Sequence, residues 1–235
     1  MYRATLPRIY ELKDLLRDPE APKSFFKAFD CRLGISNQIM QAFVEREAEL
    51  QQLNPISWNV IKEKAKPLLE IKDKKRGWHQ LIDTLNEVRG YNYLSRLGCT
   101  EPRFIPRADS KGTRTPDLQG AIGILSIVCE VKTIHISEKE IDARTKITLR
   151  DGANENRLPQ EFLNKLNSDL VAARDQLLAY CDDANARRII YMVINFDNFT
   201  TEHDAEYFNQ IDAFCGARQL QDVEVVIHDM RPQKI

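Results

Sequence analysis

The chain has 235 residues, 43% of them hydrophobic and 29% charged, and a net charge of -1 at pH 7. This length suits one domain, or one domain with an extension, and the composition is that of an ordinary soluble globular protein. No apolar run approaches the roughly 18 residues that span a bilayer, and the N-terminus lacks the features of a signal peptide. We therefore expect a cytoplasmic protein without membrane contact. Five scattered cysteines without a CxxC pair argue against a disulfide framework or a zinc site.

The first third of the chain is predicted to be helical. Residues 7–16 and 36–53 have helical character, and Ser36 or Asn37 is a suitable N-cap for the second segment. Prolines divide this region into short pieces, and they are Pro19, Pro22, Pro55 and Pro67. Residues 1–76 are therefore expected to form a helical extension of the domain that follows.

From residue 77 the pattern changes to helices alternating with strands. Residues 77–97 follow the helical period, and Gly98 is well placed to end that helix. Residues 122–136 form a nearly continuous apolar run rich in Ile and Val, which is typical of a central buried strand. The other predicted elements are strands at 103–106, after residue 117, at 187–196 and at 223–229, and helices at 159–181 and 202–215.

The element order from residue 77 is α-β-β-β-α-β-α-β. This order predicts an α/β fold for residues 77–235, with a mixed central sheet flanked by helices and the helical extension at its N-terminus. Residues 137–158 are charged and contain an Asp-Gly turn signal, so they form either a surface hairpin or a loop inserted into this core.

Charge is unevenly distributed along the chain. Residues 62–76 hold seven Lys/Arg against three Asp/Glu, and residues 103–114 hold four against one. Residues 182–235 hold five against ten. The basic segments weakly favour a polyanionic partner, although solvated helix faces explain residues 62–76 equally well.

Three charged residues are predicted to meet on neighbouring strands. Asp117 follows Pro116 where a strand begins, and Glu130 and Lys132 lie near the end of the buried strand. Because residues i and i+2 of a strand point to the same face, Glu130 and Lys132 share a face, and Asp117 can approach them if the strands pair. Two carboxylates form an oxygen-rich site that suits Mg²⁺ or Mn²⁺. Burying such charges is costly unless a metal, a partner or water compensates them, which indicates function.

An acidic residue two positions before a lysine is a common pattern, so only its position in the predicted fold can indicate a functional site. The chain contains five such triplets, at Glu11–Lys13, Glu70–Lys72, Asp73–Lys75, Asp109–Lys111 and Glu130–Lys132. Only the last lies on a predicted buried strand, which singles it out as the candidate for chemistry.

The chain from about 78 to 180 resembles the PD-(D/E)xK nuclease superfamily, which has the restriction-endonuclease-like fold. The similarity has four parts in the expected order along the predicted elements. They are Glu87 followed by Tyr93-Leu94 and Leu97-Gly98, then Pro116-Asp117, then Glu130-Val131-Lys132-Thr133, and last Gln176 with Tyr180 on the following helix. The resemblance implies a four-stranded mixed sheet flanked by helices.

The resemblance also implies roles for the residues at the strand ends. Asp117 and Glu130 would bind the metal together with the backbone carbonyl of Val131, and Lys132 would be the catalytic lysine. Glu87 would reach the metal from the first helix, directly or through water. Structural roles remain open, namely a turn residue for Asp117 and a cross-strand ion pair between Glu130 and Lys132. Glu87 could instead be an ordinary exposed helix glutamate, since Asp83 lies one turn away.

Further residues are expected to contact substrate. The resemblance implies that Gln176 and Tyr180 line the cleft and orient the lysine or the substrate backbone, although both could instead be packing residues of an amphipathic helix. Lys111 and Arg114 lie in the basic loop before the first strand of the candidate site. They are candidates for phosphate contacts, and a solvated loop is the alternative.

The function expected from the sequence is Mg²⁺-dependent hydrolysis of DNA phosphodiester bonds, by an endonuclease of restriction or defence type. The preference for restriction or defence comes from analogy, because a helical extension commonly adds recognition to such a core. The alternatives are a non-cleaving nucleic-acid or protein-interaction module on the same fold, a repair or recombination nuclease, and an RNA-directed nuclease. Double-strand cleavage at a palindrome would favour a homodimer.

Overall fold

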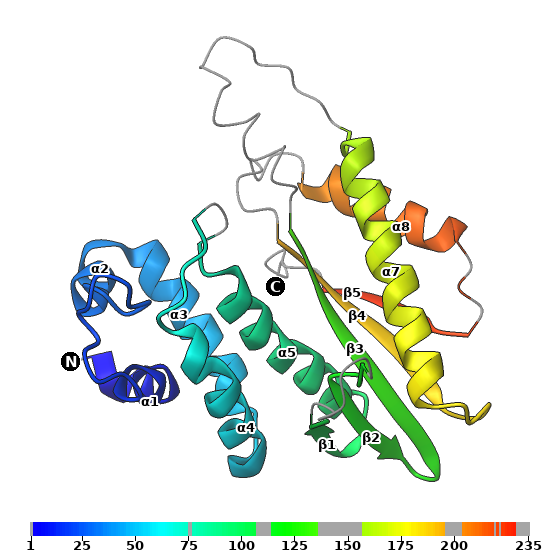
Figure 1. Cartoon of the computed structure of the whole chain (residues 1–235), viewed down its shortest axis with the longest axis horizontal. Helices are drawn as coiled ribbons and strands as arrows, with labels where there is room; N and C mark the ends of the chain where they lie inside the picture. The colour runs from blue at the N-terminus through cyan, green and yellow to red at the C-terminus, as the bar shows by residue number, and fades with distance from the viewer. Residues whose placement is uncertain are drawn as a thin grey trace. The chain divides into compact units, whose positions relative to one another are not determined.

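The computed structural model describes residues 2–74, 77–106, 114–135, 157–195, 204–218, 220 and 222–228 (Figure 1). The chain divides into two compact units, each of which is described by itself. The helical unit comprises Met1–Gly98 and Pro102–Phe104, and the sheet unit comprises Cys99–Glu101 and Ile105–Ile235. In the described part of the chain, no helix combines the length and the apolar character needed to cross a membrane.

The helical unit is built from short helices that begin at caps encoded in the sequence. Ser36 caps one helix by accepting the backbone N–H of Ile39, as predicted, and Asn54 caps the next by accepting that of Ser57. Pro55 occupies the first turn, where its missing N–H costs nothing. The elements are η1 (Tyr2–Ala4), α1 (Pro7–Asp14), α2 (Phe29–Ile35), α3 (Asn37–Gln51), α4 (Pro55–Ala65), η2 (Lys66–Leu68) and α5 (His79–Arg96).

Helix α5 packs with the N-terminal helices. Arg46 on α3 donates hydrogen bonds to the Leu85 carbonyl at 3.1 Å and to Asn86 at 3.0 Å, and both partners lie on α5. By its contacts α5 therefore belongs to the helical unit, whose boundary lies at Gly98. The sequence-based division into 1–76 and 77–235 stays a prediction about domain organisation.

The sheet unit contains a mixed sheet in the strand order β1-β2-β3-β4-β5. Strands β2 and β3 are antiparallel, whereas β3, β4 and β5 run parallel to one another. Gly123, with a φ of 60°, occupies the two-residue turn between β2 and β3, where a positive φ is favoured. The strands are β1 (Thr100–Phe104), β2 (Leu118–Ile122), β3 (Leu125–His135), β4 (Arg187–Asn195) and β5 (Glu224–His228).

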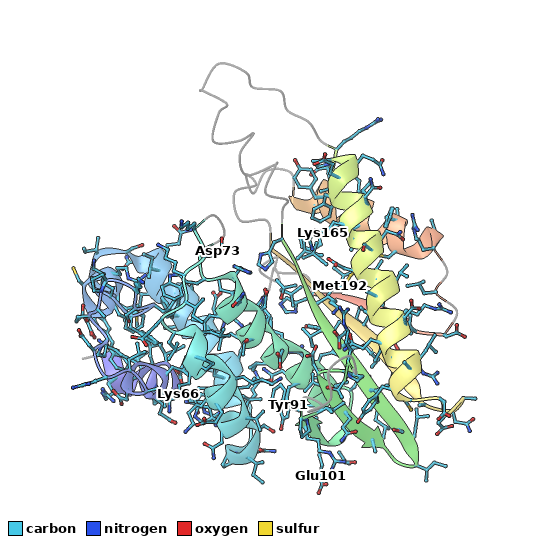
Figure 2. All side chains as sticks on the ribbon, in the orientation of Figure 1. Lys66, Asp73, Tyr91, Glu101, Lys165 and Met192 are labelled. Carbon is cyan, nitrogen blue, oxygen red and sulfur yellow. The ribbon has the colours of Figure 1, made fainter. Side chains whose placement is uncertain are left out.

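Helices α7 (Gln160–Tyr180) and α8 (Asp204–Ala217) cover one face of this sheet (Figure 1). The apolar stripe of α7, which includes Leu166, Leu170 and Leu177, packs with Val128 on β3 and with Met192 on β4, labelled in Figure 2. All five side chains are at most 2% exposed. Glu130 and Lys132 have the same strand parity as Val128, so they point toward the face that α7 covers.

The predicted fold class is confirmed, because the chain is α/β with a mixed sheet flanked by helices and an N-terminal helical region. Two details differ from expectation. The sheet has five strands, one more than the resemblance implied, and β1 begins at Thr100 rather than near residue 103. The order of elements predicted from residue 77 already contains five strands, and β1, an edge strand, corresponds to the strand predicted at 103–106. Of the predicted insertion at 137–158, all but the last two residues lie outside the described residues.

Candidate active site

The register of β2 and β3 places Asp117 next to the segment that contains Glu130. Leu118 pairs with Cys129, so Asp117, one residue earlier, stands at the position opposite Glu130. Side chains at opposed positions of an antiparallel pair share a face. The Asp117 carboxylate accepts the backbone N–H of Val131 at 2.8 Å. The paired residues of β2 and β3 end at Leu118 and Cys129, so this side chain supplies the next acceptor for β3.

The backbone of the preceding segment also holds Asp117 in place. The Asp117 carbonyl accepts the N–H of Ile105 at 2.9 Å, and Pro116 beside it is buried. The Thr115 hydroxyl donates to the Pro106 carbonyl at 3.4 Å, across the base of the loop. Asp117 is therefore fixed through both its backbone and its carboxylate, as a metal ligand would have to be.

Glu130 is a buried carboxylate that accepts hydrogen bonds from Lys132 and Gln176. It is 4% exposed, and its Oε1 accepts the Lys132 ammonium at 2.6 Å. Its Oε2 accepts the Gln176 amide at 2.7 Å. The ion pair that the sequence suggested as a structural alternative is thus present, but it joins residues i and i+2 of one strand rather than two strands. The Lys132 side chain remains 26% exposed, so its ammonium also has access to solvent.

Gln176 links three parts of the site. Its amide nitrogen donates to Glu130 on β3 and, at 2.7 Å, to the Thr115 carbonyl in the loop before Asp117. One α7 side chain therefore fixes the orientation of one carboxylate and the path of the backbone that leads to the other. Gln176 is therefore placed to orient both parts of the candidate site.

Tyr180 lies one helical turn after Gln176 and is 39% exposed. Its hydroxyl donates to the side chain of Gln119 at 3.4 Å, a long hydrogen bond. Gln119 lies two residues after Asp117 on β2 and so shares its face, although the sequence reasoning did not single it out. Tyr180 thus contacts the half-buried Gln119 side chain on β2, beside the site.

The remaining predicted residues lie elsewhere. Glu87 is on α5 in the helical unit, where it is 8% exposed and forms an ion pair with Lys64 at 2.5 Å. It is therefore not the exposed helix glutamate of the structural alternative, and its place beside a metal stays a prediction. Arg114 is exposed, which suits a phosphate contact, and Lys111 lies outside the described residues.

A cysteine adjoins the site but is not a nucleophile. Cys129 precedes Glu130 and is fully buried on the opposite face of β3. Burial, followed by the negative charges of Asp117 and Glu130, raises the pKa of its thiol well above the usual range. The thiolate is the reactive form, so Cys129 stays protonated and inert at neutral pH.

The donor set fits a hard divalent cation. Among the described residues no cluster of three or more His, Cys, Asp or Glu side chains suits a metal. Mg²⁺, however, is commonly held by one or two carboxylates and completes its octahedron with water. Each carboxylate oxygen has two lone pairs, so Asp117 and Glu130 can bind a cation while they accept their present hydrogen bonds. The Val131 N–H points toward Asp117. The N–H and the carbonyl of one strand residue point to the same side, so the Val131 carbonyl also faces Asp117 and could bind the cation.

Comparisons of the chain with protein-family models, with curated proteins and with solved structures gave no match. The resemblance to PD-(D/E)xK nucleases therefore depends on the motif residues and their positions alone.

Proposed function

We propose that this protein is a Mg²⁺-dependent nuclease of the PD-(D/E)xK type that hydrolyses DNA phosphodiester bonds, as an endonuclease of restriction or defence type. One observation supports this most. Asp117 and Glu130 lie at opposed positions where β2 begins, and Lys132 lies on the same face. A carboxylate that is 4% exposed, beside a second carboxylate, carries a desolvation cost that a structural role does not require.

Each residue of the candidate site would have a separate role in phosphodiester hydrolysis. A cation held by Asp117, Glu130 and the Val131 carbonyl would stabilise charge on the phosphodiester and lower the pKa of a bound water. The Val131 N–H keeps Asp117 directed at the site, and the Gln176 amide does the same for Glu130. Lys132 either orients the attacking water or stabilises the charge that develops on the phosphorus oxygens.

A non-cleaving module on the same fold is the second candidate. The pairing of Glu130 with Lys132 and Gln176 favours it, because these hydrogen bonds compensate the buried charge without a metal. Under this alternative the cluster would stabilise the sheet unit and have no catalytic role.

Cleavage assays separate the candidates. We expect the purified protein to cut plasmid or linear DNA in Mg²⁺ or Mn²⁺ and to be inactive in a metal chelator. Parallel reactions with RNA test the RNA-directed alternative. Nicking or linearisation of closed circular plasmid, read on a gel, identifies an endonuclease. No cleavage of any of these substrates with either metal would contradict the proposal and favour the non-cleaving module.

Replacing Gln176 with leucine should raise the Mg²⁺ concentration needed for half-maximal cleavage by about 10- to 100-fold, because residues that orient metal ligands have effects of this size. The titration distinguishes positioning from mere packing, which would leave the metal dependence unchanged. Gln160→Leu is the matched control, since Gln160 is exposed on the same helix and, within the described residues, bonds to Asn164 one turn later. Equal metal dependence in the two variants would contradict the positioning role.

A further inference from the structure

Strand β5 forms an edge of the sheet in the part of the chain that the structure describes. All five of its residues, Glu224–His228, are half-buried, and their sequence is EVVIH. Exposed sheet edges are usually protected against pairing by lysine, proline, glycine bulges or a covering element. Strand β5 contains no lysine, proline or glycine, and among the described residues no strand pairs with its outer edge, so its backbone offers this edge to another strand.

The sequence of β5 is complementary to itself in antiparallel pairing. With Val226 opposite Val226 of a second copy, Val225 lies opposite Ile227 and Glu224 lies opposite His228. The two strands would be related by a twofold axis perpendicular to the sheet, which keeps each side chain on its own face. Because opposed residues must share a face, a residue at the axis has to pair with its own copy. Opposed β-branched residues and opposed acid–base residues both favour strand pairing.

The side chains on both faces of β5 already have neighbours within the same copy, which fix their positions for contact with a second copy. On one face Arg187 holds Glu224 at 2.7 Å, and the Tyr191 hydroxyl contacts Nδ1 of His228 at 2.6 Å. On the other face Val225 and Ile227 line a cavity between β5 and α8. Its remaining lining residues are Asp212, Cys215, Gly216, Leu220 and Val223. In a pair of copies the two cavities would lie beside each other, and the apolar side chains of Val225 and Ile227 in their lining would lose exposed surface.

We propose that two copies of this chain associate through antiparallel pairing of their β5 strands. The product is a continuous ten-stranded sheet with five strands from each copy. A second copy fits this edge better than an unrelated strand, because the edge is complementary to itself in both its apolar and its polar pairs. The interface does not depend on the proposed nuclease function.

The pairing has one consequence that rests on the proposed function. Val131, Tyr191 and Val226 lie at one level across β3, β4 and β5, so Glu130 lies one residue from the level of the twofold axis. The axis leaves both Glu130 side chains on the same face of the sheet. The β3 strands of the two copies are five strand spacings apart, or about 24 Å. The dimer would therefore present two candidate sites to one partner molecule, and loss of cleavage would leave the interface itself unaffected.

Sedimentation or light scattering of the purified full chain tests the interface. We expect a mass near 54 kDa, twice the 27.2 kDa of one chain. Val226→Lys places like charges opposite each other at the axis and should weaken association by at least about 100-fold. Mixing Val226→Lys with Val226→Glu should restore a dimer. The matched control is Val171→Lys, since Val171 is exposed on α7 and should tolerate the change.

A gentler variant tests the same register if the charged ones fail to fold. Val226→Cys should form a disulfide-linked dimer on mild oxidation, because opposed residues in antiparallel strands have Cα atoms about 4.5–5.5 Å apart. Wild type and Val171→Cys should not. A monomeric wild type would overturn the proposal. So would a dimer unaffected by Val226→Lys, or oxidation of Val226→Cys that yields no more linked dimer than Val171→Cys.

Discussion

Replacing Asp117 with asparagine should reduce metal-dependent DNA cleavage by about 10³-fold or more and leave the fold intact. The asparagine oxygen can still accept the Val131 N–H, so the end of the β2–β3 ladder keeps its hydrogen bond. The substitution removes the negative charge that would bind the cation. Metal stabilisation of the transition state is worth several kcal/mol, and each 1.36 kcal/mol corresponds to about a factor of ten in rate.

The comparison needs a control that changes an equivalent charge outside the site. Asp175 precedes Gln176 on α7, its side chain is 63% exposed, and its ion pair with Arg174 is a long one at 3.5 Å. Asp175→Asn should therefore cleave like wild type, while circular dichroism and thermal unfolding of Asp117→Asn should match wild type. Undiminished cleavage by a folded Asp117→Asn protein would contradict a metal site at this position.

The fold was predictable because its signals are local. The run of Ile and Val around Glu130 predicts a buried central strand, which is β3. The apolar stripe of α7 has the helical period, and the order of elements from residue 77 is the predicted one. Strand parity alone places Glu130 and Lys132 on one face. The approach of Asp117 followed once β2 and β3 were assumed to pair, and their two-residue turn at Gly123 fixes the register.

The contacts that orient the candidate site were not predictable, because they join side chains to backbone atoms distant in sequence. The Asp117 carboxylate bonds to the Val131 N–H, and Gln176 bonds to the Thr115 carbonyl. No periodicity encodes which loop carbonyl faces a helix. Gln176 was singled out through the resemblance, whereas Gln119 had no signal apart from lying two residues after Asp117. The ion pair between Glu87 and Lys64 could not be predicted either, because Lys64 lies 23 residues earlier on another helix.

Replacing Lys132 with methionine should both slow cleavage strongly and destabilise the protein. Methionine keeps a long unbranched side chain but removes the ammonium that pairs with Glu130 at 2.6 Å. Removing one partner of a buried ion pair leaves an uncompensated charge, and that costs about 3–5 kcal/mol at fully buried sites. Since Lys132 is 26% exposed and Gln176 remains bound to Glu130, we expect about 1–3 kcal/mol from urea unfolding. Cleavage should fall about 10²- to 10³-fold.

The double variant Glu130→Gln/Lys132→Met distinguishes the two roles of this pair. It removes both charges and keeps a carbonyl oxygen at position 130 that can accept the Gln176 amide, so most of the lost stability should return. Cleavage should not return, because the metal ligand and the lysine are both absent. Recovery of stability without cleavage would show that the protein can be stable without this ion pair. The pair would then be present because cleavage needs it. Full cleavage by Lys132→Met alone would instead show that Lys132 has no catalytic role and that its ion pair with Glu130 only stabilises β3.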